Sequence, residues 1–221
     1  MIDQGYTNLC GMAVCATILA KYKPETYEAL VYDLNNKGLA KVNNYKIKVN
    51  RRVANVENNF FKKASIPEAD WLLLASMRNK FNSPFLPYGG KMSNCYEKIS
   101  GSNFPNGIKK RLKHMGFGNI KNKMNGFYPV CKPALKTINE IDSLFKSGKT
   151  IVLLINTKMY KNGKFSMFSN HFVIYNGNLM VNLDKNTLSF NILTFGFKNG
   201  MNINVSPSAF KNNYFGYLSV N

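Results

Sequence analysis

The sequence predicts an α+β protein in which the helices come first and a mainly antiparallel sheet comes last. Segments with the 3.6-residue periodicity of helices occupy the chain up to about residue 148. From about residue 149 onward, short apolar runs separated by turn residues are typical of strands. Because no internal repeat or linker divides the 221 residues, we expect one domain, with a helical lobe over about 1–148 and a sheet lobe over about 149–221.

Five segments carry helical patterns: residues 10–22, 24–34, 69–81, 105–115 and 137–147. The first is almost entirely small and aliphatic, which predicts a helix buried on most of its faces. Thr7 or Asn8 is placed to cap its start, and Pro24 ends it. Ser65-Ile-Pro-Glu68 has the form of a capping box, so we expect it to open the third helix.

Strand patterns dominate the last third of the chain. Residues 150–156 form a continuous apolar run, which suits a central strand. Further strands are expected over residues 45–49, 172–175, 179–182, 188–196 and 214–220, and a short helical turn over 206–210.

The chain is strongly basic. Thirty Lys and Arg residues against eleven Asp and Glu residues give a net charge of +19, and only four of the thirty are Arg. This excess favours an acidic partner, either a protein substrate or an inhibitor, unless it only reflects a Lys- and Asn-rich composition. No apolar stretch reaches the ~18 residues of a membrane-spanning helix, so we expect no membrane span.

Cys10 is the first candidate for chemistry, because it stands at the start of the buried helix. Backbone N–H groups and the helix dipole favour a thiolate at such a position. Gln4 lies six residues upstream, near enough to offer its amide to an oxyanion, and Gly11 lets a substrate approach closely. Cys15 lies more than one turn inside the apolar helix and is expected to be a core residue.

His171 is the candidate base for this cysteine, since it opens an expected strand, where pockets commonly form. His114, the other histidine of the chain, lies in a basic helix and is expected to favour the C-terminus of that helix. The four cysteines include no Cys-x-x-Cys pair, and with two histidines we expect no metal site and no cofactor.

These residues form a pattern that resembles the papain-like cysteine hydrolases. Gln4-Gly5-x4-Cys10-Gly11 precedes a buried helix, and its glutamine-to-cysteine spacing is similar to that of the family's oxyanion glutamine and nucleophile. Leu193-Thr-Phe-Gly196, which ends 25 residues after His171, is similar to the family's Asn-Ser-Trp-Gly segment. The chain departs from the family in that Leu193 replaces the asparagine, Phe195 replaces the tryptophan, and no aromatic residue follows the cysteine. The resemblance implies a papain-like two-lobed fold.

A third residue would orient the imidazole of His171 and stabilise its protonated form. Asn191 shares its strand face with Leu193 and is our first choice. Asp184 and Asn182, from the preceding hairpin, are the alternatives, and a Cys/His dyad without a third side chain stays open.

The resemblance implies a cysteine hydrolase. His171 would take the proton of Cys10, the thiolate would attack an amide carbonyl, and Gln4 would hold the oxyanion before water releases the acyl group. We expect proteolysis of an intracellular target protein. Deamidase, amidase or transglutaminase-type acyl transfer would use the same residues, so the motif alone does not separate these reactions.

Within that family the chain is similar to the papain-like toxin domains of bacterial secreted effectors. The resemblance implies delivery by a secretion system, action in the cytoplasm of a target cell, and inhibition by a cognate, acidic immunity protein.

The non-enzymatic alternative is a basic nucleic-acid-binding module. Lys109-Lys-Arg-Leu-Lys113 and Lys121 to Lys123 would follow phosphates, and Phe117, Phe127 and Tyr128 would stack on bases. No recognised nucleic-acid motif supports this alternative, so nucleic acid is the less expected partner.

Overall fold

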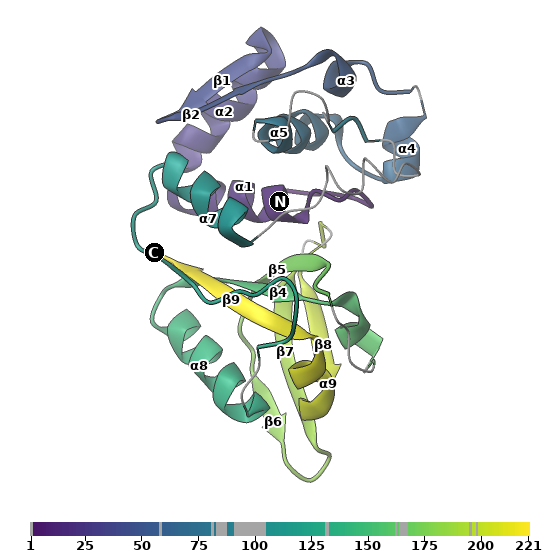
Figure 1. Ribbon diagram of the computed structural model, residues 1–221. Helices are drawn as coiled ribbons and strands as arrows, with labels where there is room; N and C mark the ends of the chain where they lie inside the picture. The colour runs from purple at the N-terminus through teal and green to yellow at the C-terminus, as the bar shows by residue number, and fades with distance from the viewer. Residues whose placement is uncertain are drawn as a thin grey trace. The chain divides into compact units, whose positions relative to one another are not determined.

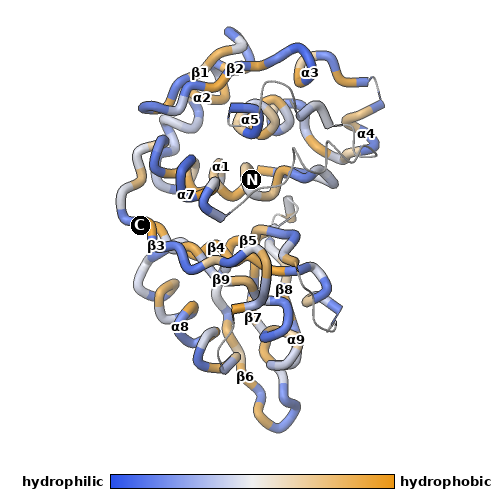
Figure 2. The backbone as a smooth tube through the Cα atoms, in the orientation of Figure 1, coloured by the Kyte–Doolittle hydropathy of each residue, from blue (hydrophilic) through white to orange (hydrophobic). Residues whose placement is uncertain are grey.

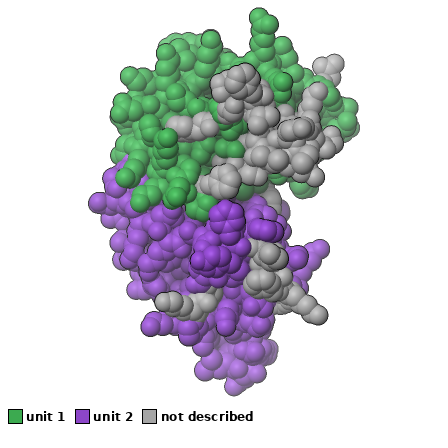
Figure 3. All heavy atoms as spheres, in the orientation of Figure 1, with its two compact units in different colours: residues 1–116 green, residues 117–221 purple. Residues whose placement is uncertain are grey.

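The computed structural model describes residues 2–57, 59–80, 82, 88–90, 105–130, 133–161, 163, 168–194, 196–197 and 199–221. The chain divides into two compact units, residues 1–116 (unit 1) and residues 117–221 (unit 2), which Figure 3 colours separately. The predicted α+β class is confirmed, because the described residues form helices together with antiparallel sheets. None of the helices in this part of the chain has both the length and the apolar character that a membrane crossing needs.

Unit 1 is mainly helical. Its described elements are α1 (Cys10–Tyr22), α2 (Pro24–Lys37), β1 (Leu39–Val42), β2 (Tyr45–Lys48), α3 (Arg51–Ala54), α4 (Phe60–Ala64), α5 (Glu68–Asn79) and α7 (Pro105–His114) (Figure 1). α1 packs against α2, α5 and α7, which explains why its sequence is apolar on almost every side.

Proline and glycine bound the helices of unit 1 as expected, but two predicted caps are wrong. Leu9 precedes α1 without a side-chain cap, because the Thr7 hydroxyl donates to the Gln4 carbonyl oxygen at 2.6 Å instead. Ser65 does not open α5; it ends α4 in the left-handed conformation, at φ 51°, and Pro67 precedes α5. Ser65 is thus the C-cap of the preceding five-residue helix rather than the N-cap of the following one.

A two-stranded hairpin completes unit 1. The expected strand at 45–49 is β2, and it pairs antiparallel with β1, which the sequence analysis did not predict. The pairing alternates buried and exposed residues, so Ala40, Val42, Tyr45 and Ile47 face the helices. The Tyr45 hydroxyl donates to the Met77 carbonyl oxygen at 2.6 Å, which fastens the hairpin to α5.

Unit 2 is built around an antiparallel sheet. Its described elements are β3 (Ile120–Asn122), α8 (Ala134–Lys146), β4 (Thr150–Ile155), η1 (Thr157–Lys161), β5 (His171–Tyr175), β6 (Met180–Asn182), β7 (Thr187–Leu193), β8 (Met201–Val205), α9 (Pro207–Asn213) and β9 (Tyr214–Val220). The strands follow the order β3-β9-β4-β5-β7-β6, and β8 also pairs with β7.

The predicted central strand is confirmed as β4, which pairs with β5 on one side and β9 on the other. All of its residues are buried, and Figure 2 shows apolar residues over β4 and β5. Ile151, Leu153 and Ile155 face a core that α8 and α9 help to close. The sequence analysis missed β8, whose exposed residues Asn202 and Asn204 interrupt the apolar pattern.

The boundary between the units falls at residues 116 and 117, earlier than the expected lobe boundary near 148. The reason is packing: β3 pairs with β9, and α8 packs on β4 and α9, so both elements belong with the sheet. α7 is on the other side of the boundary. Lys23 Nζ and Asn43 Nδ2 both donate to the Met115 carbonyl oxygen just after α7, at 3.3 and 2.9 Å.

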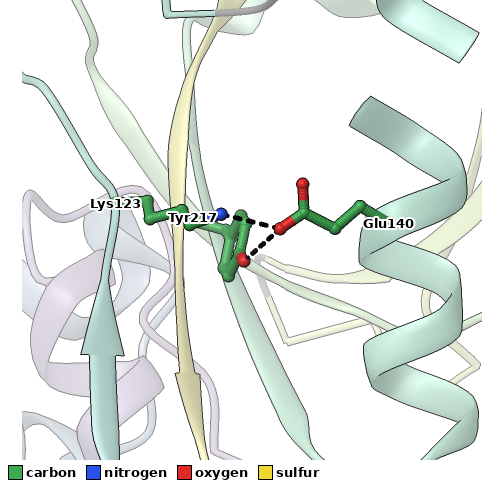
Figure 4. Close-up of polar contacts among 3 residues, drawn as sticks. All are labelled: Lys123, Glu140 and Tyr217. Atoms are coloured by element: carbon green, nitrogen blue, oxygen red, sulfur yellow. Dashed lines mark hydrogen bonds and ion pairs between the residues drawn. The ribbon is translucent and has the colours of Figure 1, made fainter. Parts of the chain in front are cut away.

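Three side chains of unit 2 connect the residue just after β3 with β9 and α8 (Figure 4). Glu140 Oε1 accepts a hydrogen bond from Lys123 Nζ at 2.8 Å and another from the Tyr217 hydroxyl at 2.7 Å. These two bonds hold the pKa of Glu140 below its ordinary value, and the bond from Lys123 has the larger effect. The carboxylate therefore binds the helix to the edge of the sheet in its charged form.

Glu140→Gln should make the unfolding free energy of the protein less sensitive to acid. The lowered pKa of Glu140 contributes stability that is present above its ordinary value of 4.5 and is lost as the pH falls through the folded-state pKa. Because Lys123 and Glu140 are each 45% exposed, the effect should stay below about 1 kcal/mol. Urea unfolding at about pH 7 and about pH 3 measures it.

Asp184→Asn, which neutralises an exposed carboxylate in the β6–β7 turn, is the matched control. An acid sensitivity of Glu140→Gln equal to that of the wild type would contradict the role assigned to the carboxylate.

Candidate active site

The segment before Cys10 is held against α4 and α5 by a series of short bonds. The Asp3 backbone N–H donates to Asp70 Oδ2 at 2.9 Å, and the Gly5 N–H donates to Asp3 Oδ1 at 2.7 Å. Gly5 has φ 51°, and a Cβ there would lie 2.1 Å from the Ala64 carbonyl oxygen, so no other residue fits without moving the backbone. Gln4, which is 4% exposed, is thus positioned by its neighbours on both sides.

Cys10 is the first residue of α1, as the sequence predicts, and its side chain is 9% exposed. Leu9, just before it, accepts the first helical bonds from the N–H groups of Met12 and Ala13. The thiol therefore lies at the positive end of the helix dipole, where a thiolate is favoured. Cys15 lies deeper in α1, and burial raises its pKa to about 12, which keeps that thiol protonated.

Arg78, in the last turn of α5, is a functional candidate that the sequence analysis missed. It is only 8% exposed, and hydrogen bonds fix the residues on both sides of it. Met77 accepts the Tyr45 hydroxyl at 2.6 Å, and the Asn79 side chain exchanges two hydrogen bonds, of 2.7 and 2.9 Å, with the Tyr88 backbone. The residues on both sides of Arg78 are therefore fixed, and its side chain lies within the core of unit 1.

The charge of Arg78 acts on Cys10. Burial and the neighbouring Arg111 lower the pKa of Arg78 to about 10, so the guanidinium is still protonated at neutral pH. Tyr45, Tyr88 and Cys10 act in the opposite direction, because their negative forms stabilise the guanidinium. Cys10 is the last of these three contributions, so the guanidinium and the thiol lie within electrostatic range of each other in unit 1.

His171 is the first residue of β5 and pairs with Ile155 of β4. It is 4% exposed, and burial lowers its pKa to about 4, so the imidazole is neutral at neutral pH. A neutral ring is the form that can accept a proton from a thiol. The structure thus places the two predicted catalytic residues in different units, Cys10 in unit 1 and His171 in unit 2.

Thr194 is the residue that the structure brings to the imidazole ring. Its Oγ1 lies 2.6 Å from His171 Nε2, a hydrogen bond whose direction depends on the tautomer. β5 and β7 pair Ile174 with Leu193, and this register brings the residue after β7 toward the start of β5. Thr194 therefore holds the imidazole ring through Nε2 at the end of β7.

The residues predicted as third members lie elsewhere in unit 2. Asn191 Oδ1 accepts a hydrogen bond from Asn202 Nδ2 at 2.9 Å, across the β7–β8 pair. Asn182 Oδ1 accepts from the Lys185 N–H at 2.8 Å within the β6–β7 turn, and Asp184 is exposed in the same turn. The assignment of Asn191 to catalysis stays a prediction.

Phe195 lies outside the described part of the chain, as do the two remaining cysteines, Cys95 and Cys131. His114 ends α7, within the helix where it was predicted. Among the described residues, no group of three or more His, Cys, Asp and Glu side chains is arranged to hold a metal ion.

The residues predicted to contact nucleic acid differ in exposure. Arg111, in the middle of the lysine-rich segment of α7, is 3% exposed, and Phe117 is 5% exposed. Neither can reach a phosphate or a base from the core. Phe127 and Tyr128, in contrast, are among the most exposed aromatic residues described.

Comparison of the chain with models of protein families, with curated proteins and with solved structures gives no match in any of the three. The chemistry of the site is therefore inferred from its own residues.

Arg78→Met should move the formation of the Cys10 thiolate to higher pH. Methionine fills an apolar environment without leaving a charge there, so the fold should tolerate it. If the thiol pKa rises by about one, alkylation of Cys10 by iodoacetamide slows about tenfold at a fixed pH below the titration. Peptide mapping after alkylation at a series of pH values measures the rate of Cys10 alkylation as a function of pH. Arg78→Lys keeps the positive charge, so its alkylation rates should be close to those of the wild type.

Arg111→Met is the matched control, because it removes an equally buried guanidinium whose charge lowers the pKa of Cys15. An equal displacement of the Cys10 profile in both methionine variants would rule out a specific role for Arg78.

Thr194→Val should change the tautomer balance of His171. The valine is nearly isosteric but cannot hydrogen-bond to Nε2, so the proton is no longer held on a defined ring nitrogen. Nitrogen-15 NMR of the imidazole distinguishes the two neutral tautomers. Asn191→Ala should leave the ring signals unchanged. A change in Asn191→Ala together with unchanged signals in Thr194→Val would make Asn191 the orienting residue.

Proposed function

We propose that the protein is a papain-like cysteine hydrolase that cleaves an amide bond with Cys10 as nucleophile and His171 as base, most readily as a protease. The observation that carries the proposal is the environment of Cys10: it begins α1, and the buried charge of Arg78 acts on it. A helix N-terminus and a nearby positive charge both favour a thiolate.

The environment of His171 supports the same role. Its imidazole is neutral, and Nε2 is bonded to Thr194. In the tautomer in which Nε2–H donates to Thr194 Oγ1, Nδ1 is the acceptor that takes the thiol proton. We therefore assign Thr194 as the orienting residue, with Asn191 as the alternative that the tautomer measurement tests.

The proposed reaction proceeds in two steps. The Cys10 thiolate attacks the amide carbonyl, and the oxyanion accepts hydrogen bonds from the Gln4 amide and the Cys10 N–H. The protonated His171 gives its proton to the leaving amine, and a thioester to Cys10 remains. Water, deprotonated by His171, then hydrolyses the thioester and regenerates the thiol. That Cys10 of unit 1 and His171 of unit 2 act as one pair is itself part of the proposal.

The biological setting is part of the proposal as well. A net charge of +19 suits encounter with an acidic protein, either the substrate or an immunity protein that blocks the site. We propose a bacterial effector or toxin, delivered by a secretion system, that acts on a protein in the cytoplasm of the target cell.

Cys10→Ala should abolish hydrolysis and also change the titration of His171. A thiolate beside the imidazole stabilises its protonated form, so the pKa of His171 should be higher in the wild type than in Cys10→Ala. Burial alone sets it at about 4. Proton NMR of the histidine ring follows the titration, and His114→Gln identifies the signal of His171.

Cys15→Ala, in the same helix, is the control and should leave both hydrolysis and the titration unchanged. A pKa of His171 that is identical with and without the Cys10 thiol would show that the pair does not form.

Mass spectrometry of a proteome treated with the protein separates the reactions that share this site. New chain ends indicate proteolysis, conversion of glutamine to glutamate indicates deamidation, and crosslinked peptides indicate acyl transfer. Each product should be missing after treatment with Cys10→Ala.

A further inference from the structure

Two loops of unit 2 are joined just before β5, and both carry exposed aromatic residues. The N–H of Ser169 donates to the Gly126 carbonyl oxygen at 3.4 Å, and Ser169 Oγ donates to the same oxygen at 3.2 Å. Phe127 and Tyr128 follow Gly126, and Phe168 precedes Ser169. These three side chains, which we call the aromatic surface, are 67%, 60% and 59% exposed.

The first loop is fastened to the sheet at both ends. The Asn125 N–H donates to the Phe215 carbonyl oxygen at 2.7 Å, and the Val130 N–H donates to the Tyr214 carbonyl oxygen at 3.1 Å. Asn125 Oδ1 also accepts the N–H of Phe127 at 2.9 Å. The backbone that carries the exposed rings is therefore anchored to β9.

The second loop is fastened to η1. Asn156 Nδ2 donates to the Phe168 carbonyl oxygen at 2.7 Å. The Asn170 side chain accepts the N–H of Thr157 at 2.9 Å and donates to the Thr157 hydroxyl at 3.1 Å. Phe168 thus has a fixed backbone three residues before His171.

Aromatic rings on anchored backbone are well suited to binding. They bury a large area on association and lose little conformational entropy, because few torsions remain to be fixed. Soluble proteins seldom expose several large apolar side chains together unless a partner covers them. The aromatic surface therefore has the properties of a docking site.

The surrounding charge restricts the partner. η1 carries Lys158 and Lys161, both exposed, and unit 2 has twelve lysines against three acidic residues. Two of those acids already bind lysines, Glu140 with Lys123 and Asp142 with Lys146. Unit 2 contains no arginine, the residue that grips phosphates in bidentate fashion, so acidic polypeptide is favoured over nucleic acid.

We propose that the aromatic surface, together with Lys158 and Lys161, docks an acidic polypeptide segment that carries apolar side chains. The apolar side chains contact the three rings, and the carboxylates lie near the two ammonium groups. The inference rests on the proposed function, because it makes this polypeptide the substrate. The docked segment is presented to His171, which lies three residues after Phe168.

Binding of a random copolymer of glutamate and tyrosine tests the proposal. Fluorescence anisotropy with the full chain carrying Cys10→Ala avoids turnover of the probe. The copolymer should bind at least about tenfold more tightly than polyglutamate of the same length, because only the copolymer supplies apolar contacts. Phe127→Ser with Phe168→Ser should reduce the copolymer affinity to that of polyglutamate.

Met180→Ser with Leu183→Ser is the matched control. Both residues are at least as exposed as Phe168, at 63% and 75%, but they belong to the β6–β7 hairpin, so the copolymer affinity should not change. Equal loss in the two double variants overturns the proposal, as does wild-type affinity in the aromatic variant. Binding of oligothymidylate that is tighter than that of the copolymer, and that needs Phe127 and Phe168, also overturns it.

The outcome is separable from that of the proposed function. Binding is measured without catalysis, so a docking surface is detected even if Cys10→Ala hydrolyses amides as well as the wild type does. Conversely, hydrolysis that depends on Cys10 but is unaffected by the aromatic variant keeps the hydrolase and rejects the docking surface.

Discussion

Burial of two guanidinium groups is the constraint around which unit 1 is organised. Arg78 and Arg111 are both less than one-tenth exposed, and they repel each other across the core. Removing charge from water is costly unless polar groups compensate for the lost solvent. The Tyr45 hydroxyl hydrogen-bonds with Arg111 while donating to α5, so the group that fastens the β1–β2 hairpin also solvates a charge. In the proposed function, a thiolate at Cys10 compensates for the charge of Arg78 in the same way.

Unit 2, in contrast, buries a titratable group, His171, in its neutral form. His171 takes up the position of a core residue at the start of β5, and desolvation removes its charge at neutral pH. Thr194 satisfies one ring nitrogen without adding a charge. The two units thus differ in electrostatics: unit 1 places a positive charge near the Cys10 thiol, and unit 2 holds a neutral imidazole that can accept a proton. In the proposed function, these are the two halves of a nucleophile activated by a general base.

Local sequence patterns predicted most elements but not the partners of the side chains. The starts of α1 and α2 and the strands β4, β5 and β9 follow from apolar periodicity and Pro24, which act over a few residues. Thr194 could not be found in this way, since its contact depends on the register between two strands of the sheet. Arg78 was missed because a charged residue in a helix is ordinarily exposed, and only the packing of α1, α5 and α7 shows it to be buried.

The positive charges of the protein fall into two chemically different sets: guanidinium groups in the core and mainly lysine ammonium groups on the surface. Two of the four arginines, Arg78 and Arg111, are in the core, and the exposed pair, Arg51 and Arg52, are adjacent in α3. Surface charge is therefore carried almost entirely by lysine. Acylation of amines would neutralise that layer while leaving the guanidinium groups of the core intact. Long-range attraction by the surface and the electrostatics of the core are thus chemically independent in this molecule, although both arise from basic residues.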